Sequence, residues 1–162
     1  MRNLGSFEFK KSIQILFLDF DGVLTNNSVH IDELGREYVT CCRYDGFGIA
    51  SLLKHGITPI VLTTETKPLA RQRCLKLQLA CFDCIEDKYS AALKILESRK
   101  LSFSQASFLG NDINDLVLLK NVAFPIVTPD SHESIHNEHF YVTSRSGGNG
   151  CVREVCEFLC SQ

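Results

Sequence analysis

Four short apolar runs, separated by helix-like segments, limit most strongly how this chain can fold. The runs cover residues 13–19, 58–63, 106–110 and 122–127. Nearly continuous apolar runs of this length are typical of strands buried on both faces, because both sets of alternating side chains must avoid water. Such strands occur in parallel sheets that are covered by helices on either side.

Helical patterns lie between and after these runs. The expected helices cover residues 47–55, 68–77, 88–99, 112–120 and 151–160. Gly56 closes the first, and a proline begins the second, as is common at these positions. Strands alternating with helices predict a Rossmann-like, doubly wound α/β sheet, in which ligands bind at the carboxyl ends of the strands.

One segment breaks the alternation. Residues 28–41 have the pattern of two short strands around a turn at Gly35, so we expect a β-hairpin insertion over about residues 26–42, after the first strand. Exposed hairpin edges invite association, which favours an oligomer without fixing the number of subunits. The length of 162 residues suits one domain, so we expect residues 1–162 to share a single core.

Composition excludes several classes of partner. A net charge of −2 with no basic stripe argues against nucleic-acid binding. No apolar run approaches the roughly 20 residues that would cross a membrane. The first residues lack the apolar middle of a signal peptide, so we expect a cytoplasmic protein.

Two patterns superficially suggest zinc. Of the eight cysteines, only Cys81 and Cys84 have C-x-x-C spacing, and we interpret the cysteines as small buried apolar side chains. His132 and His136 match H-E-x-x-H, but they lie in a short polar segment without a second supporting feature. We therefore do not expect zinc chemistry.

The first strand runs into Asp19 and Asp21, followed by a glycine that permits a sharp turn. Two carboxylates at a strand end can hold Mg²⁺ through hard oxygen ligands. They can also divide the work of phosphoryl transfer, with Asp19 as the nucleophile and Asp21 as the general acid and base. A solvated Asp-x-Asp turn is the plainer alternative, and the wholly apolar strand before it argues against that alternative.

The end of the second strand and the start of a predicted helix also carry polar residues. The Thr63 hydroxyl can donate to a phosphoryl oxygen, and Thr64 and Glu65 follow it. Lys88 begins a predicted helix, where the helix dipole disfavours a cation, so a functional reason is indicated. Lys88 could neutralise a phosphate and the aspartates around it.

The residues at four strand ends resemble the motifs of the haloacid dehalogenase-type (HAD) phosphatases. In chain order they are Asp19, Thr63, Lys88 and the stretch from Asn111 to Asp115. The resemblance spans nearly the whole chain and implies a capless HAD-like fold. It also implies a Mg²⁺-dependent phosphatase that works through an aspartyl phosphate.

The resemblance assigns roles to the acidic residues. Asp19 and Asp21 would bind the metal, and Asp115 would orient the lysine. The family usually has an acid where this chain has Asn111, whose carbonyl oxygen is still a legitimate Mg²⁺ ligand. Asp112 is the alternative third ligand, directly or through water.

A narrower resemblance involves the hairpin and residues 43–49 and 147–155, which are similar to the branch acting on phosphorylated ulosonic acids. That branch includes phosphatases for 3-deoxy-manno-octulosonate 8-phosphate and for nonulosonate (sialic-acid-like) 9-phosphates, and the phosphatase-like domain of acylneuraminate cytidylyltransferases. Glu65, Arg73 and Lys76 favour the nonulosonate 9-phosphate. The octulosonate 8-phosphate is the alternative.

Thr64, Glu65, Arg73 and Lys76 are the candidate substrate-binding residues. Glu65 and Lys76 would lie about 15 Å apart along a helix, too far for one site to use both from the same chain. Arg73 and Lys76 share a helix face. We therefore hypothesise that they bind a substrate carboxylate across a subunit interface, and a solvated basic face is the alternative. The resemblance implies a homotetramer, with a cytidylyltransferase as a possible partner.

Two non-catalytic alternatives stay open. A tetramerisation or regulatory module would tolerate Asn111, and a phospho-receiver domain would share the acidic strand end and the lysine. The paired carboxylates of Asp19 and Asp21 argue against the first, since a structural domain has no need for two close charges that repel each other. A phospho-receiver domain would need neither an acid/base at Asp21 nor the hairpin.

Overall fold

The computed structural model describes residues 12–136 and 138–161, so the first residues, on which the cytoplasmic prediction depends, lie outside the described part of the chain. Six parallel strands form the main sheet in the order β5-β4-β1-β6-β7-β8. Their bounds are β1 (Ile15–Leu18), β4 (Thr58–Leu62), β5 (Ala80–Phe82), β6 (Ala106–Gly110), β7 (Phe124–Val127) and β8 (Tyr141–Val142). The predicted doubly wound α/β sheet is confirmed.

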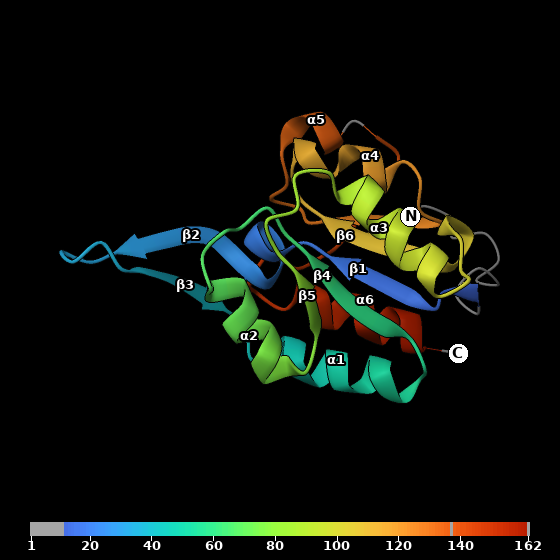
Figure 1. Cartoon of the computed structure of the whole chain (residues 1–162), viewed down its shortest axis with the longest axis horizontal. Coiled ribbons are helices and arrows are strands. Elements are labelled where there is room, and N and C mark those ends of the chain that lie inside the picture. The colour runs from blue at the N-terminus through green and yellow to red at the C-terminus, as the bar shows by residue number, and fades with distance from the viewer. Residues whose placement is uncertain (1–11, 137, 162) are drawn as a thin grey trace.

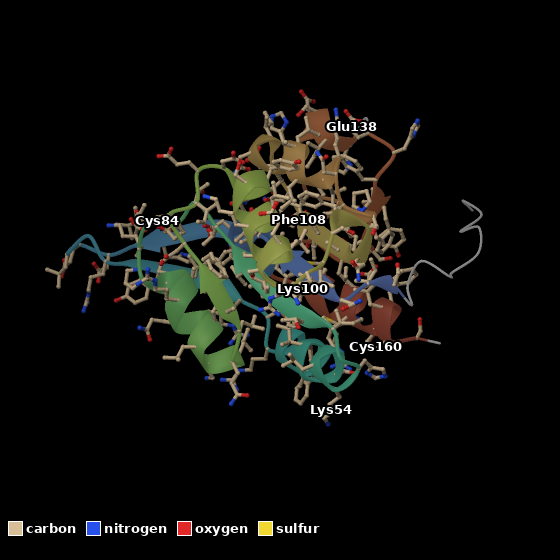
Figure 2. The ribbon with its side chains drawn as sticks, turned by 45° about the vertical axis from the view of Figure 1, so that its right-hand side comes forward. Lys54, Cys84, Lys100, Phe108, Glu138 and Cys160 are labelled. Atoms are coloured by element: carbon tan, nitrogen blue, oxygen red, sulfur yellow. The ribbon has the colours of Figure 1, made fainter. Side chains whose placement is uncertain are left out.

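Strand β1 lies at the centre of the sheet, between β4 and β6. Leu16 and Leu18 belong to the apolar cluster on one face, and Ile15 and Phe17 belong to the cluster on the other. Phe108 of β6 is fully buried in the middle of the molecule (Figure 2). Burial on both faces explains why the strands appear in the sequence as continuous apolar runs.

Helices cover both faces of the sheet (Figure 1). On one face lie α1 (Tyr44–Lys54), α2 (Leu69–Leu77) and α6 (Cys151–Cys160), and on the other lie α3 (Lys88–Ser98), α4 (Leu116–Leu119) and α5 (Glu133–His136). The Ser51 hydroxyl donates to the Cys160 sulfur at 3.8 Å, and the ends of α1 and α6 lie together in Figure 2. None of the helices in the described part of the chain is long and apolar enough to cross a bilayer.

The predicted hairpin is also confirmed. Strands β2 (Thr25–Ile31) and β3 (Glu37–Cys41) pair antiparallel as a separate two-stranded sheet and project from the body of the molecule (Figure 1). Its outer part exposes the apolar side chains of Val29, Ile31 and Leu34. The hairpin leaves the body beside the carboxyl end of β1, so it stands next to the predicted site.

Several predicted elements differ from those observed. The edge strands β5 and β8 were missed, because three and two residues are too short to display a periodic pattern. The expected helix over 112–120 is a 3₁₀ turn (Ile113–Asp115, η4) followed by α4. Helix α1 begins at Tyr44, earlier than predicted, where the Asp45 carboxylate accepts the Arg153 backbone N–H at 3.0 Å and ties this turn to α6.

Candidate active site

Three neighbouring strands deliver the polar residues that the sequence singled out. Asp19 follows β1, Thr63 follows β4 and Asn111 follows β6, so the three lie along one edge of the sheet. Lys88 begins α3, after the Asp87 side chain that caps this helix. All four residues are buried, with at most 6% of their surface exposed.

Lys88 forms ion pairs with two carboxylates at this edge of the sheet. Its Nζ atom lies 2.8 Å from Asp19 Oδ1 and 2.6 Å from Asp115 Oδ1. The second oxygen of Asp115 accepts the backbone N–H groups of Asn111 at 2.8 Å and Asp112 at 3.2 Å. Asp115 is therefore held by its own loop while it holds the lysine, which is the geometry expected of a lysine-orienting residue.

Burial controls the charges of this group. It raises the pKa of Asp19 to about 7, with a further increase from the Asp115 charge and an opposing effect from Lys88. Burial alone would lower the pKa of Lys88, but the two carboxylates outweigh it and the pKa is raised. Lys88 therefore stays cationic between the two acids at neutral pH.

Asp21 occupies a different environment from Asp19. It lies in the turn Phe20–Leu24 (η2), is only partly buried, and accepts a hydrogen bond from the Thr25 hydroxyl at 3.3 Å. Burial raises its pKa, and the Glu65 charge raises it further. A carboxyl group that holds its proton more tightly is suited to act as a general acid.

Gly22 allows the loops after β1 and β6 to meet. Its φ is +75°, in the left-handed region that favours glycine. A Cβ at this position would collide with the Asn111 side chain. The glycine after Asp21 is therefore required both by the turn and by the close approach of the asparagine.

These residues surround a small cavity of about 110 Å³. The residues that line it are Asp19, Asp21, Asn27, Thr63, Thr64, Asn111, Asp112 and Asn114. Sequence reasoning missed Asn27 and Asn114 as lining residues. Asn114 lies within the stretch from Asn111 to Asp115, and Asn27 lies six residues after Asp21 with a positive φ of 61°. The residue type alone does not distinguish a lining asparagine from an ordinary loop residue.

The residues present fit a magnesium ion. Among the described side chains, Asn111 Oδ1 is buried without a hydrogen-bond partner, and such an atom is costly unless a ligand satisfies it. With the carboxylates of Asp19 and Asp21 it offers three hard oxygen ligands at the edge of the cavity. Asp112 is exposed, and its Oδ1 already accepts the Ile113 backbone N–H at 2.6 Å. We therefore favour Asn111 over Asp112 as the third ligand.

The four candidate substrate-binding residues do not lie together: Thr64 and Glu65 follow β4, whereas Arg73 and Lys76 lie on α2. Thr64 lines the small cavity, and one oxygen of Glu65 accepts the N–H groups of Thr66 and Lys67, each at 2.7 Å. Arg73, on α2, donates from Nη2 to the Cys42 carbonyl at 2.9 Å, at the base of the hairpin.

Lys76 is exposed on the same helix, α2. Of the two expected cations, it is the one left at the surface, while Arg73 is partly buried against its own chain.

A scan against protein-family models finds none that matches this chain. A curated relative, the 3-deoxy-D-manno-octulosonate 8-phosphate phosphatase KdsC of Salmonella typhi, is 29% identical over 150 residues, covering 92% of this chain and 80% of the relative. The Moraxella catarrhalis 3-deoxy-D-manno-octulosonate 8-phosphate phosphatase, solved with magnesium, phosphate and KDO, has a TM-score of 0.89 and 27% identity over 94% of this chain and 88% of its own. A Streptomyces avermitilis protein described as a HAD family hydrolase has a TM-score of 0.90 and 34% identity, covering 96% and 89% of the two chains.

Proposed function

Because this chain belongs to the HAD family of hydrolases, we propose that it is a magnesium-dependent phosphatase for a phosphorylated ulosonic acid, with 3-deoxy-manno-octulosonate 8-phosphate as the first candidate. The observation that carries the proposal is the buried Lys88 held between Asp19 and Asp115, with Asp21 on the rim of the same cavity. A purely structural domain gains little from burying three charged groups, since their desolvation offsets their attraction.

The first chemical step uses Asp19 and Asp21. A carboxylate oxygen of Asp19 attacks the phosphorus, forming an aspartyl phosphate while the ester P–O bond breaks. Asp21 gives its proton to the departing alkoxide, so the sugar acid leaves as an alcohol. Lys88 and the Thr63 hydroxyl stabilise the negative charge on the phosphoryl oxygens.

The second step releases phosphate. Asp21, now a carboxylate, takes a proton from a water molecule as that water attacks the aspartyl phosphate. The bond between Asp19 and phosphorus breaks, which regenerates the Asp19 carboxylate and the protonated Asp21. The partial burial that raises the pKa of Asp21 supports its return to the acid form.

Asp19, Asp21 and Asn111 would hold Mg²⁺ in this scheme, with Asp112 as the alternative to the asparagine. The bound ion would neutralise phosphoryl charge and help to position the phosphate for attack. The presence of magnesium and phosphate in the Moraxella catarrhalis structure supports magnesium as the ion.

The comparisons support the octulosonate 8-phosphate over the nonulosonate 9-phosphate that Glu65, Arg73 and Lys76 predicted, because the relatives above are named for the former. Phosphate release from 3-deoxy-manno-octulosonate 8-phosphate and from N-acetylneuraminate 9-phosphate, each with and without Mg²⁺, tests the proposal. Turnover of the first at a higher kcat/KM is the expected result. A preference for the second would restore the nonulosonate assignment. No turnover of either would overturn the proposed substrate, and no turnover of p-nitrophenyl phosphate as well would favour a non-catalytic module.

We also propose that the chain forms a homotetramer through the hairpin, as its resemblance implies. A two-stranded sheet that exposes Val29, Ile31 and Leu34 supports association, because apolar side chains on an open hairpin gain from being covered. Binding of a substrate carboxylate by Arg73 and Lys76 across a subunit interface, and association with a cytidylyltransferase, stay predictions.

A further inference from the structure

A second cavity adjoins the small one and opens beneath the hairpin. It has a volume of about 280 Å³, and its lining residues are Asp21, Asn27, Ser28, Val29, Glu37, Val39 and Glu65. It shares Asp21 and Asn27 with the small cavity. The hairpin cavity, as we call it below, therefore begins at Asp21, where a group leaving the phosphorus would emerge.

The small cavity is too confined to enclose both a phosphate and a long sugar acid, since cavities that bury small ligands commonly measure about 300–1,000 Å³. The rest of the substrate must lie outside it. The hairpin cavity is the space that begins at the general acid, so it is the place where the leaving group would lie.

The walls of the hairpin cavity have a definite chemistry. Two carboxylates, Glu37 and Glu65, line it together with Asp21, and carboxylates only accept hydrogen bonds when ionised. One oxygen of Glu65 is occupied by two backbone N–H groups. Lys67 lies on the surface, and its Nζ is 4.0 Å from Glu37 Oε1.

A lining rich in carboxylates favours hydrogen-bond donors and repels anions. Hydroxyl groups can donate to the carboxylates, and hydrogen bonds to charged groups are stronger than those between neutral groups. A substrate carboxylate at the same place would meet like charges. Val29 and Val39 supply apolar surface to the same cavity, which suits the carbon chain between hydroxyl groups.

We propose that the hairpin cavity is the hydroxyl-binding subsite for the leaving group, and that Glu37 of β3 is a specificity residue that accepts hydrogen bonds from the sugar hydroxyls nearest the phosphate. This inference rests on the proposed function and deepens it. It orients the substrate: the phosphate lies at Asp19, the hydroxyl-bearing carbons lie under the hairpin, and the carboxylate at the far end lies outside the acidic cavity.

Glu37→Ala is the informative variant, and Glu33→Ala is its matched control. Both glutamates belong to the same hairpin, but Glu33 is exposed in the turn between the strands and does not line the cavity. The full-length protein with Mg²⁺ is assayed on 3-deoxy-manno-octulosonate 8-phosphate and on p-nitrophenyl phosphate, which has the same phosphate and no hydroxyl groups.

We expect Glu37→Ala to reduce kcat/KM on the sugar acid phosphate at least about tenfold more than on p-nitrophenyl phosphate, as the loss of a hydrogen bond to a charged group implies. Most of this loss should appear in KM. Glu37→Gln, which keeps an accepting oxygen, should lose less than Glu37→Ala, and Glu33→Ala should behave as the wild type does.

Equal losses on both substrates, or no loss on either while the wild type turns over the sugar acid phosphate, would overturn the subsite. Failure of the proposed function gives a different result. In that case the wild-type protein hydrolyses p-nitrophenyl phosphate but neither ulosonate phosphate, and the proposed substrate is overturned before Glu37 is considered.

Discussion

The edge of the parallel sheet and the hairpin beside it are built in opposite ways. At the sheet edge, Asp19, Lys88 and Asp115 are buried and linked by ion pairs of 2.6 and 2.8 Å. On the hairpin, Ile31 is 65% exposed and Leu34 is 72% exposed, and among the described strands the two pair only with each other.

This difference in burial suggests that the two regions have different roles. Groups that attack or protonate must be held in place before the substrate arrives, which a packed sheet edge achieves. A two-stranded hairpin is only marginally stable by itself, and it becomes more stable when another surface covers it. We infer that the sheet edge carries out the reaction, and that the hairpin selects the leaving group and mediates the association of subunits.

The largest effect should come from Asp19→Asn. Without a nucleophile, phosphate release should fall on the order of 10⁴-fold or more, since removal of a nucleophile typically costs several orders of magnitude. Phosphate release is measured under saturating Mg²⁺ and substrate, and circular dichroism checks that the fold is retained. Residual activity within tenfold of the wild type would contradict the assignment of the nucleophile.

Lys88→Met should be the most destabilising change at the sheet edge. It leaves the buried carboxylates of Asp19 and Asp115 facing each other without a cation, which should cost about 3–5 kcal/mol of unfolding free energy. Urea denaturation measures the change. Lys94→Met, an exposed lysine on the same helix, is the control and should change stability by less than about 0.5 kcal/mol.

Asp45 belongs to α1, the helix that follows β3, so its titration reports on the packing at the base of the hairpin. Burial raises its pKa to about 6, against the opposing effects of the Arg153 backbone N–H and of Arg73 and Arg145. A raised pKa favours the protonated group in the folded state, so this contribution to stability is complete below about pH 4 and is lost as the pH rises through 6.

Asp45→Asn removes this titration and keeps an oxygen for the Arg153 N–H. The unfolding free energy of the wild type, relative to the variant, should therefore fall by on the order of 2–3 kcal/mol between pH 4 and pH 8. Denaturant unfolding at several pH values measures it. A difference that stays constant with pH would show that Asp45 is not perturbed by burial.

Asn111→Ala tests the metal site. The change removes the buried Oδ1 atom that has no hydrogen-bond partner among the described residues, so half-maximal activity should require about tenfold more Mg²⁺. Asp112→Ala is the matched comparison and should shift the requirement less. A larger shift for Asp112→Ala would make Asp112 the third ligand.

The smallest effect on the chain itself should come from Ile31→Glu. An exposed hairpin side chain contributes little within the protomer, so unfolding free energy at subunit concentrations that favour monomers should change by less than about 0.5 kcal/mol. The molar mass from light scattering should nevertheless fall if the hairpin holds the tetramer. An unchanged mass would place the subunit contact elsewhere.

The sequence predicted the fold and most of the sheet edge because both follow from local patterns. Continuous apolar runs indicated the buried strands, and the residues just after three of them, Asp19, Thr63 and Asn111, do lie together. Lys88 was found because a lysine at a helix N-terminus opposes the dipole. The edge strands β5 and β8 were missed because strands this short have no detectable period.

The sequence alone therefore predicts the order of the polar groups at the strand ends and their chemical types. The use of these groups depends on the tertiary structure: it turns Arg73 towards the Cys42 carbonyl, leaves Asn111 Oδ1 buried without a partner among the described residues, and places Glu37 and Asp21 in the lining of one cavity. The physical reason is that backbone periodicity arises from neighbours along the chain, whereas burial, side-chain direction and pKa depend on groups that are brought together from distant parts of it.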